Sequence, residues 1–176
     1  MATQVLNVKN KIRAVKDFPK PGIIFRDITT ALKEPDTLKE MVDYLCEQFK
    51  NEKIDYIAGI ESRGFIFGMP MAYKLNAGFV PIRKPNKLPA ETISQEYALE
   101  YGTDKIEIHT DAIEKGANVL VVDDLLATGG TAEAACELIK KTGGNLIGVA
   151  FLIELEALNG RAKFDKDLKV VSMLKY

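Results

Sequence analysis

Two adjacent carboxylates followed by a loop of small residues form the pattern in this chain that points most directly to chemistry. Asp123 and Asp124 end a short apolar run, and a Thr-Gly-Gly-Thr sequence follows at residues 128–131. Backbone N–H groups in such a loop can surround a phosphate at the start of a helix, and the threonine hydroxyls add donors. Ionised carboxylates nearby are good acceptors for ribose hydroxyls. The pattern therefore predicts a site for a sugar monophosphate.

The spacing in this loop argues against two common nucleotide motifs. A Walker A loop has a lysine before its final Ser or Thr, and Gly130 stands at that position, so a triphosphate is disfavoured. The GxGxxG pattern of dinucleotide-binding proteins is also absent from the sequence. A glycine-rich turn does not by itself require two acids beside it, which favours the functional interpretation.

Five stretches of the chain resemble one known family. Residues 119–131 resemble the phosphoribosyl-pyrophosphate (PRPP) motif of the type I phosphoribosyltransferases. Four other stretches narrow the resemblance to the adenine-specific members of that family: residues 17–27 (DFPKPGIIFRD), 59–65 (GIESRGF), 83–89 (RKPNKLP) and 97–102 (YALEYG). The resemblance covers essentially the whole chain and implies transfer of 5-phosphoribosyl from PRPP to adenine, which gives AMP and pyrophosphate.

The resemblance also implies roles for particular residues. Asp123 and Asp124 would bind the ribose hydroxyls, near a Mg²⁺ ion that is held mainly by substrate and water. The 5′-phosphate would be held by residues of the loop, namely Ala127, Thr128, Gly129, Gly130 and Thr131. Pyrophosphate would be bound by a second set of residues, half of them basic, namely Glu61, Ser62, Arg63, Arg83, Lys87 and Tyr101. Because many family members hold the pyrophosphate loop in a strained or cis form, we expect an unusual peptide bond between Glu61 and Ser62.

The adenine site implied by the resemblance is built from Ile24, Phe25, Arg26 and Leu125. Phe25 would stack on the purine, a contact typically worth about 1–3 kcal/mol, and Leu125 would pack on the opposite face. Glu100, carried over from the Leu-Glu-Tyr-Gly sequence, is the candidate general base and acid at the adenine nitrogens. One departure from the family is Asn86, at a position where the family often has Gly, which leaves the backbone path of that loop open.

Two alternative functions remain open at this stage. One is a phosphoribosyltransferase for another base, such as guanine, hypoxanthine or orotate, although the Phe25 and Glu100 motifs argue against it. The other is a PRPP-sensing regulator that keeps the fold without catalysis, although it would need an added DNA-binding segment or a basic face. An assay with PRPP, Mg²⁺ and each base in turn separates all three.

Hydrophobic periodicity predicts the elements that position these residues. Dense apolar runs predict strands at residues 54–60, 79–83, 118–122, 146–153 and 168–174, with helices at 65–75 and 131–141. Helical spacing also predicts a helix through Val15, and Thr37-x-x-Glu40 predicts a capping box. Turn residues 102–104 predict an antiparallel hairpin. We therefore expect an α/β single domain over 1–176, mainly a parallel sheet flanked by helices, with a hood at about 1–30 and a flexible catalytic hairpin at about 91–110.

Composition sets limits on the remaining function classes. The chain has 176 residues with 24 Lys+Arg, 25 Asp+Glu and one His, so it lacks the basic excess of a nonspecific nucleic-acid binder and a histidine cluster for zinc. No apolar run is long enough to cross a membrane or to act as a signal peptide. Cys46 and Cys136 are interpreted as reduced thiols, which favours the cytoplasm. The family resemblance adds a homodimer, to which the apolar residues 65–67 would contribute.

Overall fold

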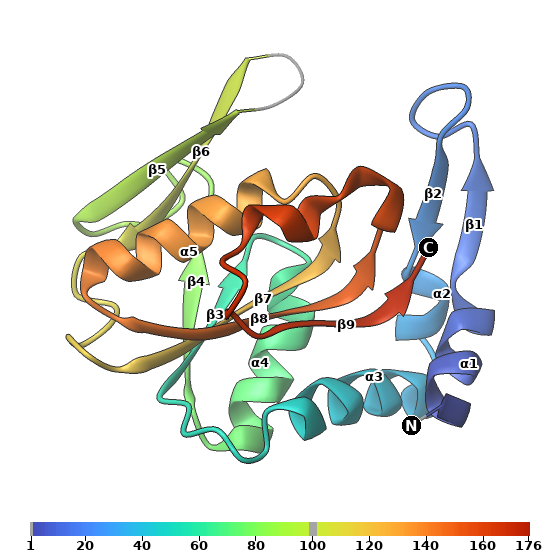
Figure 1. The fold of residues 1–176 in the computed structure, drawn as a ribbon, viewed down its shortest axis with the longest axis horizontal. Helices are drawn as coiled ribbons and strands as arrows, with labels where there is room; N and C mark the ends of the chain where they lie inside the picture. Colours follow the sequence, from blue (N-terminus) through green and yellow to red (C-terminus); the bar gives the residue numbers. More distant parts are fainter. Residues whose placement is uncertain (1, 99–101) are drawn as a thin grey trace.

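A five-stranded parallel sheet lies at the centre of the computed structural model, which describes residues 2–98 and 102–176 (Figure 1). Its strands lie in the order β4 (Gly78–Ile82), β3 (Tyr56–Ile60), β7 (Asn118–Leu126), β8 (Asn145–Glu154) and β9 (Val170–Lys175). The run from Val119 to Val122 has no exposed surface, because a parallel sheet is covered on both of its faces. The α/β fold predicted from the sequence is confirmed.

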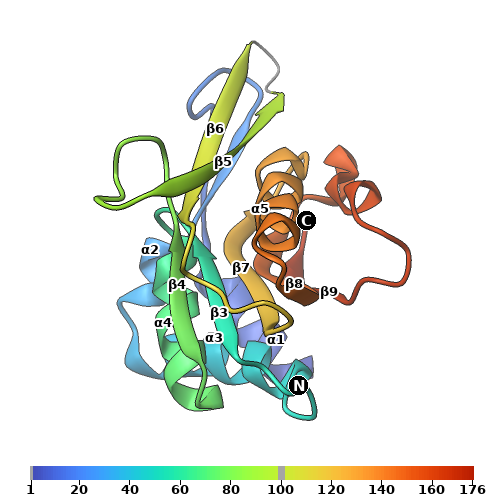
Figure 2. The same ribbon diagram turned by 90° about the vertical axis from the view of Figure 1, so that its left-hand side faces the viewer.

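Helices cover both faces of the sheet. The helices α3 (Pro35–Gln48) and α4 (Gly64–Leu75) pack on one face, and α5 (Gly130–Thr142) packs on the other (Figures 1 and 2). Each face has its own apolar core, with Met41 and Phe67 in the first and Leu138 and Phe151 in the second. Gly143 ends α5 in a left-handed conformation, as the Gly143-Gly144 pair predicts.

The N-terminal segment forms a hood at one edge of the sheet. It contains α1 (Ala2–Lys11), the antiparallel pair β1 (Arg13–Lys16) and β2 (Ile24–Asp27), and the short helix α2 (Thr29–Leu32). Val8, Ile12 and Ile28 join the same core as α3 and α4. The hood is therefore fixed to the sheet, while its hairpin projects beyond it (Figure 1).

A second hairpin projects on the opposite side of the molecule. Its strands are β5 (Thr92–Ala98) and β6 (Thr103–His109), which are antiparallel as predicted. Arg83 and Glu107 exchange backbone hydrogen bonds, so the base of this hairpin continues from the end of β4. After β8, two 3₁₀ turns follow, η1 (Glu156–Leu158) and η2 (Gly160–Lys163).

The turn predicted at residues 102–104 is placed too late, because Thr103 and Asp104 already pair with β5 as part of β6.

Three other local predictions are wrong. Val15 lies in a strand, because its backbone pairs with Phe25 across the hood hairpin and tertiary pairing outweighs helical spacing. The capping box at Thr37 does not form: α3 begins at Pro35, and Thr37 is buried inside the helix. The central strand extends past Val122 to Leu126, because β8 pairs with it as far as that residue.

Candidate active site at the ends of two central strands

The two central strands create the position of the site. From β3 the chain crosses to β4 on one side, and from β7 it crosses to β8 on the other, so the strand order reverses between β3 and β7. In open α/β sheets, ligands bind outside the carboxyl ends of the strands at this reversal. A cavity of about 320 Å³ lies there, which we call the central cavity. It is lined by Ile60, Glu61, Ser62, Arg63, Lys84, Tyr97, Asp123, Asp124 and Thr131.

Gly64 brings the loop after β3 against the acidic pair. A Cβ atom at this position would lie 2.6 Å from the Val122 carbonyl oxygen and 3.2 Å from the Asp123 Cα atom. Such distances are shorter than van der Waals contact, so only glycine lets the start of α4 approach β7 this closely. Arg63, the preceding residue, is thereby placed beside the two aspartates.

Asp123 and Asp124 lie in β7, and Arg63 forms an ion pair with the second of them. The Arg63 Nε atom is 2.7 Å from a carboxylate oxygen of Asp124, whose side chain is 8% exposed. Burial raises the pKa of both carboxyls, and repulsion from Asp124 raises that of Asp123 further. Arg63 opposes this rise at Asp124. One guanidinium thus serves two neighbouring carboxyls, and it pairs directly with Asp124.

The acidic pair also suits the metal that the family resemblance implies. Within residues 2–98 and 102–176, no group of three or more His, Cys, Asp or Glu side chains is placed to hold a metal ion. Mg²⁺ commonly keeps several waters and binds through one or two carboxylates together with substrate phosphates. Asp123 and Asp124 therefore fit a Mg²⁺ held mainly by substrate and water.

Glu61 organises the basic residues on the other side of the central cavity. Its carboxylate accepts two hydrogen bonds from the Arg83 guanidinium, both 3.1 Å, and one of 2.9 Å from the Lys84 backbone N–H. These donors lower the pKa of Glu61. The peptide bond between Glu61 and Ser62 is cis, which confirms the unusual bond expected there. Glu61 thus fixes the predicted pyrophosphate loop to the end of β4.

The loop after β4 contains two further predicted residues. Lys87 is exposed, and its carbonyl accepts a 3.1 Å hydrogen bond from Arg83. Asn86 has a φ of 64°, in the left-handed region that asparagine tolerates better than most residues, so the backbone path of a glycine is retained here.

Lys84 belongs to a small polar cluster whose contacts were not predicted from the sequence. Its ammonium group pairs with Asp104 in β6, and the Tyr97 hydroxyl donates a 3.1 Å hydrogen bond to the same carboxylate. The cluster connects the β5–β6 hairpin to the wall of the central cavity. Partners 20 and 7 residues distant from Asp104 in the chain gave no local signal.

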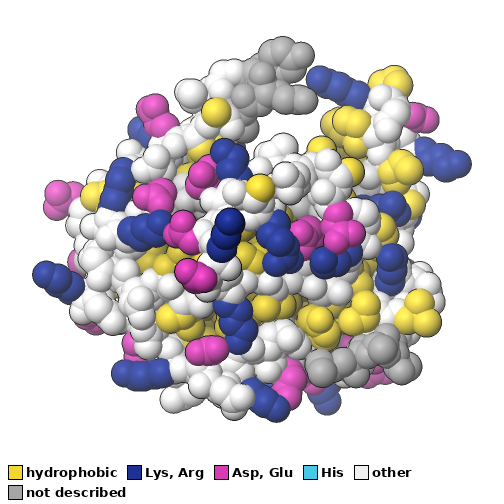
Figure 3. Space-filling view, in the orientation of Figure 1, with side chains coloured by type: hydrophobic (Ala, Val, Ile, Leu, Met, Phe, Trp, Pro, Cys, Tyr) yellow, Lys and Arg dark blue, Asp and Glu magenta, His cyan; other side chains and the backbone are white. Residues whose placement is uncertain are grey.

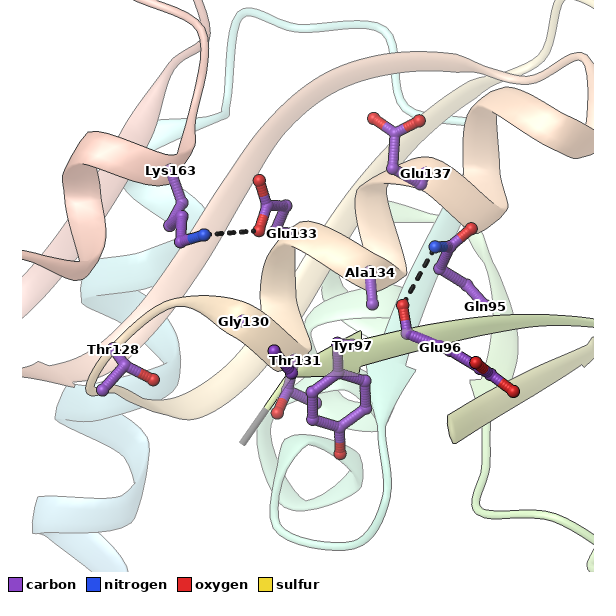
Figure 4. A pocket seen from close by; sticks show the side chains of 11 residues that line it. Gln95, Glu96, Tyr97, Thr128, Gly130, Thr131, Glu133, Ala134, Glu137 and Lys163 are labelled. Carbon is purple, nitrogen blue, oxygen red and sulfur yellow. Dashed lines mark hydrogen bonds and ion pairs between the residues drawn. The ribbon is translucent and has the colours of Figure 1, made fainter. Parts of the chain in front are cut away.

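The phosphate loop, residues 127–131, joins β7 to α5. Gly129 has a φ of 85° and caps α5, whose first backbone N–H groups have no partner within the helix. A larger cavity of about 890 Å³ lies between this loop and the β5–β6 hairpin, and Thr128, Gly130 and Thr131 line it (Figure 4). Lys163 from η2 lines the same cavity and pairs with Glu133 at 3.2 Å, a cation that sequence reasoning missed.

The hood brings the predicted adenine residues to this region. The half-buried Phe25 ring packs edge-on against Phe18, with ring centroids 5.2 Å apart, and its centroid lies 5.9 Å from the Arg63 guanidinium. Arg26 lies over the Tyr176 ring at 4.0 Å. The Arg26 side chain is therefore engaged by the C-terminal residue, on the side chain of Tyr176.

Two of the remaining predicted residues lie in the hood and in β7, and two lie outside the described part of the chain. Ile24 is 48% exposed, and it forms with Phe18 and Ile23 an apolar tip on the hood hairpin that is visible in the space-filling view (Figure 3). Leu125 packs against the same core as the hood. The candidate catalytic Glu100 and Tyr101 lie outside the described residues.

Comparisons with known proteins agree with this geometry. The phosphoribosyl transferase domain family matches residues 28–175. The adenine phosphoribosyltransferase of Koribacter versatilis is 58% identical over 170 residues, which cover 97% of this chain and 93% of that protein. The solved adenine phosphoribosyltransferase of Rhodothermus marinus superposes with a TM-score of 0.95 at 49% identity over the full length of both chains.

A third comparison involves a structure with ligands bound. The adenine phosphoribosyltransferase of Saccharomyces cerevisiae, solved with an imino-altritol bisphosphate and adenine, has a TM-score of 0.92 and 41% identity and covers 98% of this chain and 99% of its own. The chain therefore belongs to the phosphoribosyl transferase domain family and, within it, to the adenine phosphoribosyltransferases.

Proposed function

We propose that the chain transfers the 5-phosphoribosyl group of PRPP to adenine at the central cavity, giving AMP and pyrophosphate in purine salvage. The observation that carries this proposal is that three features lie together at the carboxyl ends of the central strands. They are the Asp123–Asp124 pair, the glycine-rich start of α5, and the basic residues held by Glu61. Together they match a ligand with a 5′-phosphate, a diol and a pyrophosphate.

Each feature has a role in the reaction. The bond between C1 of the ribose and a pyrophosphate oxygen breaks, a bond from C1 to an adenine nitrogen forms, and that nitrogen loses its proton. Backbone N–H groups of the phosphate loop hold the 5′-phosphate, and Asp123 and Asp124 accept hydrogen bonds from the ribose hydroxyls. Asp123 and Asp124 would lie near a Mg²⁺ held mainly by substrate and water, which would supply charge neutralisation at the pyrophosphate.

Basic residues complete the binding of the polyanion. We assign pyrophosphate contacts to Arg63, Arg83, Lys87 and Tyr101, together with the backbone of Glu61 and Ser62. Since the Glu61 carboxylate is occupied by Arg83 and Lys84, its role is to orient cations rather than to meet the anion. Arg63 compensates Asp124 in the free protein and is available to an incoming phosphate when the ribose hydroxyls engage that carboxylate.

Adenine would bind beneath the hood. Phe25 stacks on the purine, Leu125 packs on its other face, and backbone groups of Ile24 and Arg26 read its edge. A site built to pair with an amine leaves buried groups unpaired when a 6-oxopurine enters, which is the basis of selectivity. Glu100 is assigned as the group that exchanges the proton with adenine.

The first experiment supplies the purified chain with PRPP, Mg²⁺ and each of adenine, guanine, hypoxanthine and orotate, and follows nucleotide formation by chromatography. AMP from adenine is the expected product. A preference for a 6-oxopurine or orotate would contradict the adenine assignment. No product with any base would instead support a non-enzymatic PRPP sensor.

The role of Glu100 has its own test. Glu100→Gln is expected to lower kcat by more than about tenfold, because general acid–base catalysis contributes at least that much. Glu96→Gln in β5 removes a carboxylate of the same hairpin with no assigned chemistry, and its kcat should match the wild type. A near-wild-type kcat for Glu100→Gln would reject the assignment.

We further propose that the protein is a homodimer in the cytoplasm. Phe67 is fully buried and Phe65 packs on Phe79, so the predicted contribution of residues 65–67 reduces to Ile66. Ile66, Met69 and Tyr73 form an exposed apolar stripe on α4, which we assign to a second copy of the chain. Both cysteines are free thiols, which supports a reducing compartment.

Sedimentation equilibrium tests the dimer. Tyr73→Glu should produce a monomer, because it places a charge in the proposed contact. Leu6→Glu on α1, a residue that is 60% exposed but lies outside the stripe, should leave the dimer intact. Dimerisation unaffected by Tyr73→Glu would contradict the assigned surface. Among the described residues, no helix has the length and apolarity needed to span a bilayer.

A further inference from the structure

The back of the phosphate loop is covered by a turn that arrives from elsewhere in the chain. A Cβ atom at Gly160, in η2, would lie 2.2 Å from the Ala127 carbonyl oxygen and 3.0 Å from the Gly129 nitrogen. Conversely, a Cβ atom at Gly129 would lie 2.5 Å from the Gly160 carbonyl oxygen. The two backbones are therefore in direct contact, with no side chain between them.

Contact, and not backbone conformation, explains why glycine is needed at position 160. Gly129 has a positive φ, but Gly160 is not among the glycines that do. Alanine could adopt the Gly160 conformation without backbone strain. The space behind the phosphate loop is what excludes a side chain.

An ion pair between half-buried Arg161 and the buried carboxylate of Glu154 fixes this turn. The Arg161 guanidinium donates to both carboxylate oxygens of Glu154, at 2.9 and 2.5 Å, and a third N–H donates to the Val170 carbonyl at 2.9 Å. Glu154 is 4% exposed, and its pKa is lowered by Arg161. A bidentate pair of this kind sets orientation as well as distance.

The same anchor is continuous with the start of the phosphate loop. Glu154 ends β8 opposite Leu126, the residue that precedes the loop, and the Leu155 N–H donates to the Leu126 carbonyl at 2.9 Å. At the other end of the turn, Lys163 pairs with Glu133 in the first turn of α5 (Figure 4). The turn is therefore attached to the elements on both sides of the loop.

We propose that Gly160 is a positioning residue for the 5′-phosphate, and that the Arg161–Glu154 pair holds it against the phosphate loop. This rests on the proposed function, in which that loop binds the phosphate. A cradle of backbone N–H groups binds an anion well only if the groups already point at it. Three of the four residues 127–130 are alanine or glycine and carry little side-chain bulk to fix the loop conformation, so the turn supplies that support.

The test compares two glycine variants. Gly160→Ala displaces the phosphate loop, whereas Gly148→Ala creates a similar collision, 2.8 Å from the Lys169 carbonyl oxygen, within β8. We measure the dissociation constant of ribose 5-phosphate by calorimetry, KM for PRPP and adenine, kcat, and the melting temperature. For Gly160→Ala we expect the ribose 5-phosphate dissociation constant and KM for PRPP to rise at least about tenfold, with KM for adenine within about twofold.

Comparing the effects on KM and on kcat distinguishes a specific role in positioning the phosphate from a general loss of stability. A contact made equally in ground and transition states changes KM and leaves kcat at saturating PRPP nearly unchanged. Gly148→Ala should lose melting temperature without a change in KM for PRPP. Unchanged ribose 5-phosphate binding and KM for PRPP in Gly160→Ala would overturn the proposal.

A second variant keeps the test decisive if Gly160→Ala does not fold. Arg161→Lys keeps the charge but loses the bidentate geometry. It should raise KM for PRPP about threefold or more; a lower melting temperature with unchanged KM for PRPP would overturn the proposal. If the wild type makes no AMP yet binds ribose 5-phosphate, the proposed function fails while the Gly160 comparison still stands on binding alone.

Discussion

Substituting Asp123 should make the ligand-free protein more stable while it removes the ribose contact. Burial and the neighbouring Asp124 raise the pKa of Asp123, so its ionised form is unfavourable in the folded state. Below the unfolded-state pKa near 3.9 the carboxyl is protonated in both states and has no effect on the free energy of unfolding. As the pH rises from there through the raised pKa of the folded state, the free energy of unfolding falls. Asparagine is neutral throughout, and its oxygen can still accept the 2.8 Å hydrogen bond from the Asp124 N–H.

The size of the effect follows from the charges at the site. Asp124 is buried and Asp123 is half-buried, and Arg63 pairs directly with Asp124, so Asp123→Asn removes a carboxyl whose ionised form is disfavoured by desolvation and by Asp124. Relief of one unfavourable interaction commonly yields about 1–2 kcal/mol, which for a chain of this size corresponds to about 2–8 °C in melting temperature. We expect this gain at pH 7–8, and we expect it to shrink as the pH falls towards 4.

Asp27→Asn provides a control with the opposite sign. Hydrogen bonds from Thr29 and Arg13 lower the pKa of Asp27 from 3.8 to about 2. A carboxyl whose pKa is lower in the folded state stabilises the protein at pH values above its unfolded-state pKa. This stabilisation is lost as the pH falls through the folded-state pKa. Because Arg13 is 58% exposed and solvent screens the pair, we expect a loss of about 1 kcal/mol at pH 7.

Differential scanning calorimetry of both variants without ligand, between pH 4.5 and 8, makes the measurement. The two stability differences should have opposite signs at neutral pH. A lower or unchanged melting temperature for Asp123→Asn at pH 7, or a gain that does not shrink on acidification, would refute the electrostatic reasoning.

Three further predictions rest on other contacts. Glu61→Gln keeps only one acceptor oxygen, so it removes one of the two 3.1 Å hydrogen bonds from Arg83 and weakens the other. It should raise KM for PRPP about threefold to tenfold in steady-state assays, and an unchanged KM would contradict the orienting role. Tyr176→Ala removes the ring under Arg26 and should raise KM for adenine about threefold to tenfold with kcat little changed. An equal rise in KM for PRPP would contradict the idea that Tyr176 positions the hood specifically. Burial raises the pKa of Cys46 to about 11 and that of Cys136 to about 12, so a thiol reagent at pH 8 should react with neither in the native protein and with both after denaturation; rapid native labelling would disprove their burial.

Sequence alone was sufficient for the acidic pair and the phosphate loop, whose informative residues are contiguous. The acidic pair, the glycine-rich loop and the start of α5 lie within residues 123–131, and local backbone geometry relates them directly. The central strands were also predictable, because runs of fully buried aliphatic residues have few alternatives in an α/β chain. The error at Val15 shows the limit: its helical spacing was real, but pairing with Phe25 decided its conformation.

Tertiary structure alone decided which distant residues support the site. Glycines at 64 and 160 are indistinguishable in sequence from those that serve turns, because the atoms that exclude their side chains belong to β7 and the phosphate loop. Likewise, Arg63 and Arg83 look like free cations in the sequence, but they pair with Asp124 and Glu61. Such pairs depend on how the chain brings separate segments together, so motifs identify the chemistry of this protein, while packing determines its geometry and charge balance.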